Sequence, residues 1–208
     1  MIKVIVFDFD GVLVNSNPLK DKAWFDIFDN YPNVPRNIVA DVLSKNKGTR
    51  FDILRNIFEQ AGFPKEEIQQ RIEAEALRFD ALVQDWIVKQ GLIPGVANTL
   101  ANFSTRFHIY INSGTPSPSL KTNVERLGIK HYFQDIYGSP PNKEENLKTI
   151  LDRENISEKE AVVIGDAEED YRSACSQGTF FIAVASGFYD WGLQRDFQVI
   201  SSISGLSI

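Results

Sequence analysis

The chain begins MIKVIVFDFDG, residues 1–11, and this stretch decides the fold. Residues 2–7 form a mostly apolar run, which predicts a strand buried on both faces of a parallel sheet. The run ends at Asp8 and Asp10, and Gly11 follows. Two carboxylates this close raise each other's pKa and cost stability unless a cation or a shared proton holds them. The stretch therefore predicts a metal site or a reaction centre where the strand ends.

Composition narrows the class of protein. The net charge of −6, with no run of Lys or Arg, argues against a nucleic-acid partner. No stretch approaches the roughly 20 apolar residues of a membrane-spanning helix, so no membrane partner is expected. The single cysteine, Cys175, excludes an intrachain disulfide and a cysteine-based zinc site. We expect a soluble cytoplasmic protein in which Cys175 is a small core residue of a helix.

The pattern of apolar residues changes twice along the chain. A helical block runs from residue 18 to about residue 89, and the sequence Gly-Leu-Ile-Pro-Gly at 91–95 ends it. Strands and helices then alternate, which predicts a parallel sheet with helices on both faces. The expected strands are 107–111, 135–137, 161–164, 180–184 and 198–201, and the expected helices are 117–127, 143–154 and 170–177. The fold class is therefore α/β, a Rossmann-like three-layer core with an all-helical insert.

Polar side chains gather where the predicted strands end. Ligands of an open parallel sheet bind outside the carboxyl ends of its strands. These ends carry four carboxylates, one lysine and one hydroxyl: Asp8, Asp10, Asp166, Asp170, Lys143 and Ser113. A cluster of four carboxylates needs a hard cation, and oxygen ligands suit Mg²⁺. The lysine stands where a helix should begin, against the preference of the helix dipole, which indicates a bound anion.

Four motifs in this order resemble the haloacid dehalogenase superfamily of hydrolases. They are Asp8-Phe9-Asp10-Gly11-Val12, Ser113, Lys143, and Gly165-Asp166 with Asp170. The helical insert between the first two motifs resembles the cap of phosphoglycolate-phosphatase-like and phosphoglucomutase-like members. The resemblance implies a Rossmann-like catalytic core of residues 1–15 and 92–208. It also implies a helical cap of residues 16–91 that closes over the site.

The resemblance implies roles for the acidic residues. Asp8 would attack a phosphoryl group and form an aspartyl-phosphate, while Asp10 would serve first as general acid and then as general base. Mg²⁺ would be held by Asp8, Asp166 and the backbone carbonyl of Asp10. Asp170 would bind the ion directly, bind it through water, or support another ligand. Glu169 is the alternative ligand if Asp170 points away.

The resemblance also implies a phosphate-binding set. Ser113 and Lys143 would bind the phosphoryl oxygens, and backbone N–H groups near Gly114 would add donors. Asn112 and Thr115 are rival donors at the same strand end, because both carry groups that can donate hydrogen bonds.

Three residues of the insert are candidate substrate contacts: Lys20, Lys47 and Arg50. The stretch Lys47-Gly48-Thr49-Arg50 resembles a substrate loop of the cap; its alternative interpretation is a helix N-terminus with a surface arginine. Lys20 stands where sugar-phosphate mutases of the family typically carry a histidine, which favours a phosphatase.

The sequence thus predicts a Mg²⁺-dependent phosphatase that acts on a small phosphorylated metabolite. Asp10 argues against the metal-independent dehalogenases of the family, which lack this second aspartate. A phosphosugar mutase is the alternative enzyme. A catalytically inactive phosphate-binding or regulatory protein is the alternative of another class.

Overall fold

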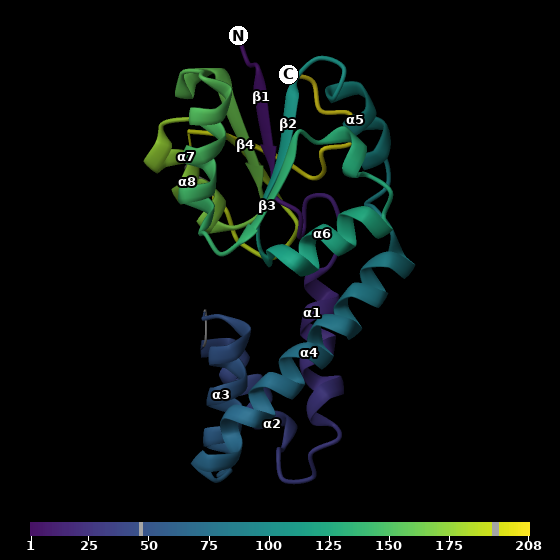
Figure 1. Ribbon diagram of the computed structural model, residues 1–208, viewed down its shortest axis with the longest axis vertical. Helices are drawn as coiled ribbons and strands as arrows, with labels where there is room; N and C mark the ends of the chain where they lie inside the picture. The colour runs from purple at the N-terminus through teal and green to yellow at the C-terminus, as the bar shows by residue number, and fades with distance from the viewer. Residues whose placement is uncertain (46–47, 193–195) are drawn as a thin grey trace. The chain divides into compact units, whose positions relative to one another are not determined.

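The computed structural model describes residues 1–45, 48–192 and 196–208 (Figure 1). They divide into two compact units, Met1–Asn17 with Ile87–Ile208, and Pro18–Trp86. The sequence predicted the boundaries after residues 15 and 91, a few residues from those in the structure, which follow residues 17 and 86. The first unit holds the sheet, and the second is helical. Within the described ranges, no helix combines the length and the apolar character needed to cross a bilayer.

The first unit is built on a parallel sheet with the strand order β3-β2-β1-β4-β5-β6. The direction of chain progression reverses between β1 and β4, and in such sheets ligands bind at this switch point. Every residue of β1 is buried, as expected of a central strand. The strands are β1 (Val4–Phe7), β2 (His108–Pro116), β3 (Asp135–Ser139), β4 (Ala161–Gly165), β5 (Phe180–Val184) and β6 (Gln198–Ile200).

Helices cover both faces of the sheet (Figure 1). Val4 and Val6 of β1 face a core shared with α7 (Lys143–Glu154) and α8 (Glu168–Gln177). On the opposite face, the ring of Phe7 stacks on Phe103 of α5 (Val96–Phe103). Alternate residues of β1 therefore bury apolar surface against different layers, each large side chain contributing about 1.5–3 kcal/mol. The remaining helices of this unit are α6 (Ser117–Arg126) and two 3₁₀ turns, Lys130–Tyr132 and Glu158–Glu160.

The second unit has an aromatic core. Phe58 packs edge-on against Phe28 and Tyr31, and Trp24 packs against Phe79. The Tyr31 hydroxyl donates a 2.7 Å hydrogen bond to Oε1 of the buried Glu75 carboxylate, whose Oε2 accepts none. The helices are α1 (Asn17–Phe28), α2 (Arg36–Lys45), α3 (Arg50–Gln60) and α4 (Lys65–Gln90).

Two details of the sequence prediction were wrong. No element was predicted between residues 95 and 107, where α5 forms. This short helix begins after Gly95, the last residue of the segment 91–95, whose positive φ of 85° redirects the chain there. Cys175 is exposed and not a core residue, because each step along a helix turns the side chain by about 100° and its neighbour Ala174 takes the buried position.

Candidate active site

Three carboxylates meet at the switch point of the sheet. Asp8 directly follows β1, and Asp166 directly follows the neighbouring strand β4. Asp170 reaches the same place from the first turn of α8. All three are buried, and each offers an oxygen within 4.8 Å of the others. The parallel pairing of β1 and β4 therefore brings together acids that are about 160 residues apart in the chain.

Lys143 lies inside this cluster. Its side chain is 5% exposed, and its Nζ lies 2.7 Å from Asp170 Oδ1 and 3.1 Å from Asp8 Oδ1. Burial alone would lower the pKa of Lys143, but the Asp170 and Asp8 carboxylates raise it above its ordinary value, so the ammonium stays charged. Lys148, one turn further along α7, is exposed. Lys143 is thus the lysine that can meet an anion at the strand ends.

Asp8 is an under-coordinated buried acid. Its Oδ1 accepts no hydrogen bond, because Lys143 Nζ approaches it outside hydrogen-bond alignment and donates to Asp170 instead. Burial raises the pKa of Asp8 to about 7, against the opposing effect of Lys143. Burial and the charge of Asp8 likewise raise the pKa of Asp166 to about 7. Both carboxylates would ionise more readily beside an additional cation.

Asp10 is held differently. The Ser16 hydroxyl donates a hydrogen bond to Oδ1, and the Thr115 hydroxyl donates one of 2.6 Å to Oδ2. Ser113 lies 3.5 Å from the same Oδ2, and its own Oγ accepts the Thr115 N–H at 3.1 Å. Sequence reasoning named Thr115 only as a rival phosphate donor and missed Ser16, although Ser16 follows the first motif closely.

Asp170 joins two parts of the site. Its Oδ2 accepts the N–H of Ala167 at 3.2 Å, which caps α8, while its Oδ1 binds Lys143. Gly165 makes this possible, since a Cβ at that position would lie 2.2 Å from Asp170 Cγ. Burial raises the pKa of Asp170, and the Lys143 charge opposes this effect. Glu169 is exposed, so Asp170 is the acid of this turn that points into the cluster.

Two residues that sequence reasoning missed contact Asp166. Asn17 and Ser186 both donate to its Oδ2, at 3.0 and 2.5 Å. Ser186 lies two residues beyond β5, so the rule that parallel strand ends converge could have found it. Gly114, a predicted source of phosphate-binding N–H groups, is exposed near the end of β2.

The candidate substrate residues of the insert lie in the helical unit. Lys20 is half-buried on α1. Arg50 begins α3, forms an ion pair with Asp80 and stacks its guanidinium over Phe79 at 5.5 Å. Its charge is therefore already matched within its own unit. Lys47 lies outside the described residues.

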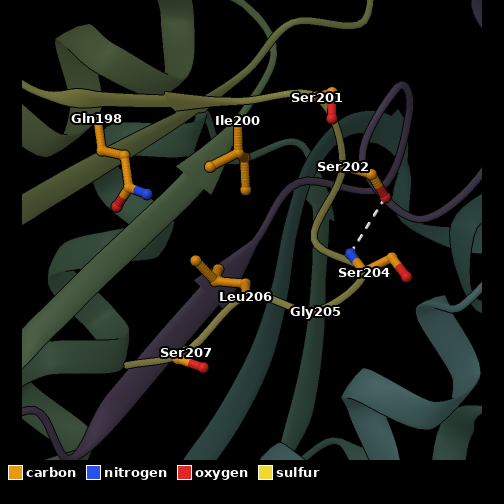
Figure 2. A pocket seen from close by; sticks show the side chains of 8 residues that line it. All are labelled: Gln198, Ile200, Ser201, Ser202, Ser204, Gly205, Leu206 and Ser207. Atoms are coloured by element: carbon orange, nitrogen blue, oxygen red, sulfur yellow. Dashed lines mark hydrogen bonds between the residues drawn. The ribbon is translucent and has the colours of Figure 1, made fainter.

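The acidic cluster fits a hard divalent cation. Its donors are carboxylate oxygens, one of which accepts no hydrogen bond, and Lys143 forms ion pairs with two of the three acids, Asp8 and Asp170. A hollow of about 440 Å³ elsewhere in the first unit offers no comparable chemistry (Figure 2). Its lining contains no charged side chain: Gln198, Ile200, Ser201, Ser202, Ser204, Gly205, Leu206 and Ser207.

Comparison with known proteins gives a consistent picture. Residues 2–176 match the family model of haloacid dehalogenase-like hydrolases. A phosphoglycolate phosphatase of Vibrio cholerae is 27% identical over 200 residues, covering 90% of this chain and 86% of that protein. Two solved structures share the fold. CbbY from Rhodobacter sphaeroides, in complex with phosphate, has a TM-score of 0.71 at 19% identity, covering 99% of this chain and 96% of that one. YfnB from Bacillus subtilis, bound to magnesium, has a TM-score of 0.72 at 16% identity, covering 97% and 95%.

Proposed function

The chain belongs to the haloacid dehalogenase-like hydrolase family, and on this premise we propose that it is a Mg²⁺-dependent phosphatase of small phosphomonoesters. One observation carries the proposal. At the switch point of the sheet, Asp8 has an oxygen that accepts no hydrogen bond and lies beside Lys143. An oxygen of Asp8 also lies within 4.8 Å of one of Asp166. Phosphoryl transfer requires this combination of a nucleophile with surrounding positive charge.

Mg²⁺ would be held by Asp8, Asp166 and the backbone carbonyl of Asp10. Asp170 completes or supports this set, and its contact with Lys143 favours the supporting role. When bound, the ion supplies positive charge beside the phosphoryl oxygens and the attacking carboxylate. A cation also removes the repulsion between acids that the structure brings this close.

The reaction has two steps. In the first, an Asp8 oxygen bonds to phosphorus as the bond to the ester oxygen breaks, and Asp10 donates its proton to that oxygen. In the second, Asp10 removes a proton from water as the water oxygen attacks phosphorus and the bond from phosphorus to the Asp8 oxygen breaks. Inorganic phosphate then leaves and Asp8 is regenerated. Lys143 and Ser113 bind the phosphoryl oxygens throughout, and the Ser16 and Thr115 hydroxyls orient Asp10 for both proton transfers.

The helical unit, residues 18–86, serves as the cap in this proposal. A cap excludes water from the reaction and contributes substrate contacts, for which Lys20 and Arg50 remain our predictions. Because the Vibrio cholerae relative is a phosphoglycolate phosphatase, 2-phosphoglycolate belongs in any panel of test substrates.

Replacing Asp8 tests the proposal directly. Phosphate release from a panel of phosphoglycolate, sugar phosphates and nucleotides should require Mg²⁺. In Asp8→Asn, kcat should fall by at least about 10³-fold because the nucleophile is lost. Asp152→Asn, an exposed aspartate of α7, is the matched control and should keep full activity. Metal-independent turnover in Asp8→Asn would refute the mechanism, and isomerisation of a sugar phosphate without phosphate release would indicate a mutase.

A further inference from the structure

One oxygen of Asp166 is enclosed by the protein. Oδ2 accepts hydrogen bonds from Ser186 Oγ at 2.5 Å and from Asn17 Nδ2 at 3.0 Å. The two donors come from opposite directions, Asn17 from the segment after β1 and Ser186 from the segment after β5. A carboxylate oxygen has two lone-pair sites, so these two donors occupy both. Asp166 therefore has only Oδ1 left for a cation.

The backbone at Gly11 makes room for the same oxygen of Asp166. Gly11 has a φ of +77°, and a Cβ at this position would lie 1.9 Å from Asp166 Oδ2. The oxygen thus occupies the space that a side chain would fill at residue 11. Gly11 therefore lets Oδ2 reach its two donors, and the hydrogen bonds from Ser186 and Asn17 occupy this oxygen.

Mg²⁺ and Ca²⁺ differ in what they need from a carboxylate. Mg²⁺ requires a near-ideal octahedron and takes carboxylates through one oxygen, whereas Ca²⁺ accepts six to eight ligands and often binds both oxygens of one carboxylate. Resting on the metal site of the proposed function, we propose that Ser186 and Asn17 restrict Asp166 to one-oxygen coordination and thereby select Mg²⁺ over Ca²⁺. Both are positioning residues, acting through Asp166.

The serine also belongs to a local turn, and this turn has a matched counterpart. Ser186 Oγ accepts the N–H of Phe188 at 3.2 Å. Ser202 Oγ accepts the N–H of Ser204 in the same way at 3.1 Å, as the dashed line in Figure 2 shows. Ser202→Ala therefore removes the turn hydrogen bond without touching a metal ligand, and Ser186→Ala removes the turn hydrogen bond together with the contact to Asp166.

Metal binding by the full chain tests the inference without relying on turnover. Isothermal titration calorimetry would give separate Kd values for Mg²⁺ and Ca²⁺. In Ser186→Ala we expect the Mg²⁺ Kd to rise about 10-fold or more. The Ca²⁺ Kd should change less or fall, because the freed Oδ2 becomes available to Ca²⁺. Asn17→Ala should shift the ratio in the same direction, whereas Ser186→Thr and Ser202→Ala should keep the wild-type ratio.

Several outcomes would overturn the inference. If the Kd values for Mg²⁺ and Ca²⁺ rise equally, or stay unchanged in both Ser186→Ala and Asn17→Ala, these residues do not set selectivity. If Ser186→Ala fails to fold by circular dichroism, Asn17→Ala alone decides the matter. Wild-type protein that binds neither ion would refute the metal site and the inference together. Wild-type protein that selects Mg²⁺ but releases no phosphate would contradict only the proposed phosphatase activity.

Discussion

Two aspartates separated by a single residue have different surroundings in this protein. Both oxygens of Asp10 accept hydrogen bonds from hydroxyl groups, supplied by Ser16 and Thr115. Oδ1 of Asp8 accepts none and lies 3.1 Å from Lys143 Nζ. A carboxyl group oriented by hydroxyls suits proton transfer, and an under-coordinated carboxylate beside a cation suits attack on phosphorus. The partners of each acid, not the spacing of the acids, support the two roles that we propose for them.

Removing one of the two hydroxyl groups that donate to Asp10 should slow catalysis without weakening substrate binding. In Thr115→Val the 2.6 Å hydrogen bond to Asp10 is lost while the side-chain volume is nearly kept. We expect kcat to fall about 10-fold, because Asp10 is less well aligned for proton transfer, with little change in KM. Steady-state kinetics would measure both values. Thr122→Val, which removes an exposed hydroxyl on α6, is the control. A raised KM with unchanged kcat would make Thr115 a substrate-binding residue instead.

At the scale of elements, a buried amide pair holds the start of α7. Asn146 donates to Asn112 Oδ1 at 3.1 Å and lies within hydrogen-bond reach of the Gly138 and Pro141 carbonyls. Asn112 in turn donates to the carbonyl of Lys143 at 2.8 Å. These contacts tie the first turn of α7 to the end of β2. A lysine at this end of a helix opposes the dipole, and the neighbouring carboxylates offset that cost.

Asn146→Ala should therefore affect both stability and phosphate binding. The substitution leaves Asn112 Oδ1 unpartnered, so the free energy of unfolding should fall by about 1–3 kcal/mol. Inhibition by inorganic phosphate should weaken several-fold, because Lys143 is positioned less firmly. Urea unfolding and phosphate inhibition constants would measure the two effects. Asn102→Ala, exposed on α5, should change neither. Lower stability with unchanged phosphate affinity would limit Asn146 to a structural role.

At the scale of the whole molecule, we expect the acidic cluster to make the free energy of unfolding depend on pH and on a bound metal ion. The pKa of Asp166 is raised from 3.8 to about 7 by burial and by Asp8. For a carboxyl group with a raised folded-state pKa, the unfolded chain ionises first as pH rises. Its stabilising contribution is therefore complete below about pH 4 and is lost as pH rises through about 7. Without metal, the fold should weaken over this window.

Comparison of Asp166→Asn with wild type isolates the contribution of Asp166 to stability. In EDTA, wild type should lose about 1–3 kcal/mol in free energy of unfolding as the pH rises from 5 to 8, and Asp166→Asn should not, because the amide never ionises. Mg²⁺ should stabilise wild type at pH 8 by mass action, and the variant much less. Urea unfolding at both pH values gives the difference. Asp152→Asn should follow the wild-type profile, and parallel profiles for Asp166→Asn and wild type would contradict the prediction.

Much of the fold could be predicted because local patterns carry it. The apolar run before Asp8 indicated a central strand, and β1 is buried throughout. Alternation of strands and helices after residue 95 indicated a parallel sheet with two helical layers. The prediction missed α5, whose eight residues directly follow the Gly- and Pro-containing segment 91–95, and it took Cys175 for a buried residue. The formation of a short helix and the exposure of a single side chain depend on packing against neighbours, which the periodicity of the sequence does not specify.

The sequence by itself determined which carboxylates converge, since parallel strands all end at one edge of the sheet and each acid follows such a strand. Only the tertiary structure decided which oxygen of each acid is paired and with what. It placed Asp170 inside and Glu169 outside, because a helix turns about 100° between them. It also supplied partners from distant segments: Ser16 on Asp10, and Asn17 and Ser186 on Asp166. Such contacts depend on side-chain direction and distances of a few ångströms, which motif spacing does not specify.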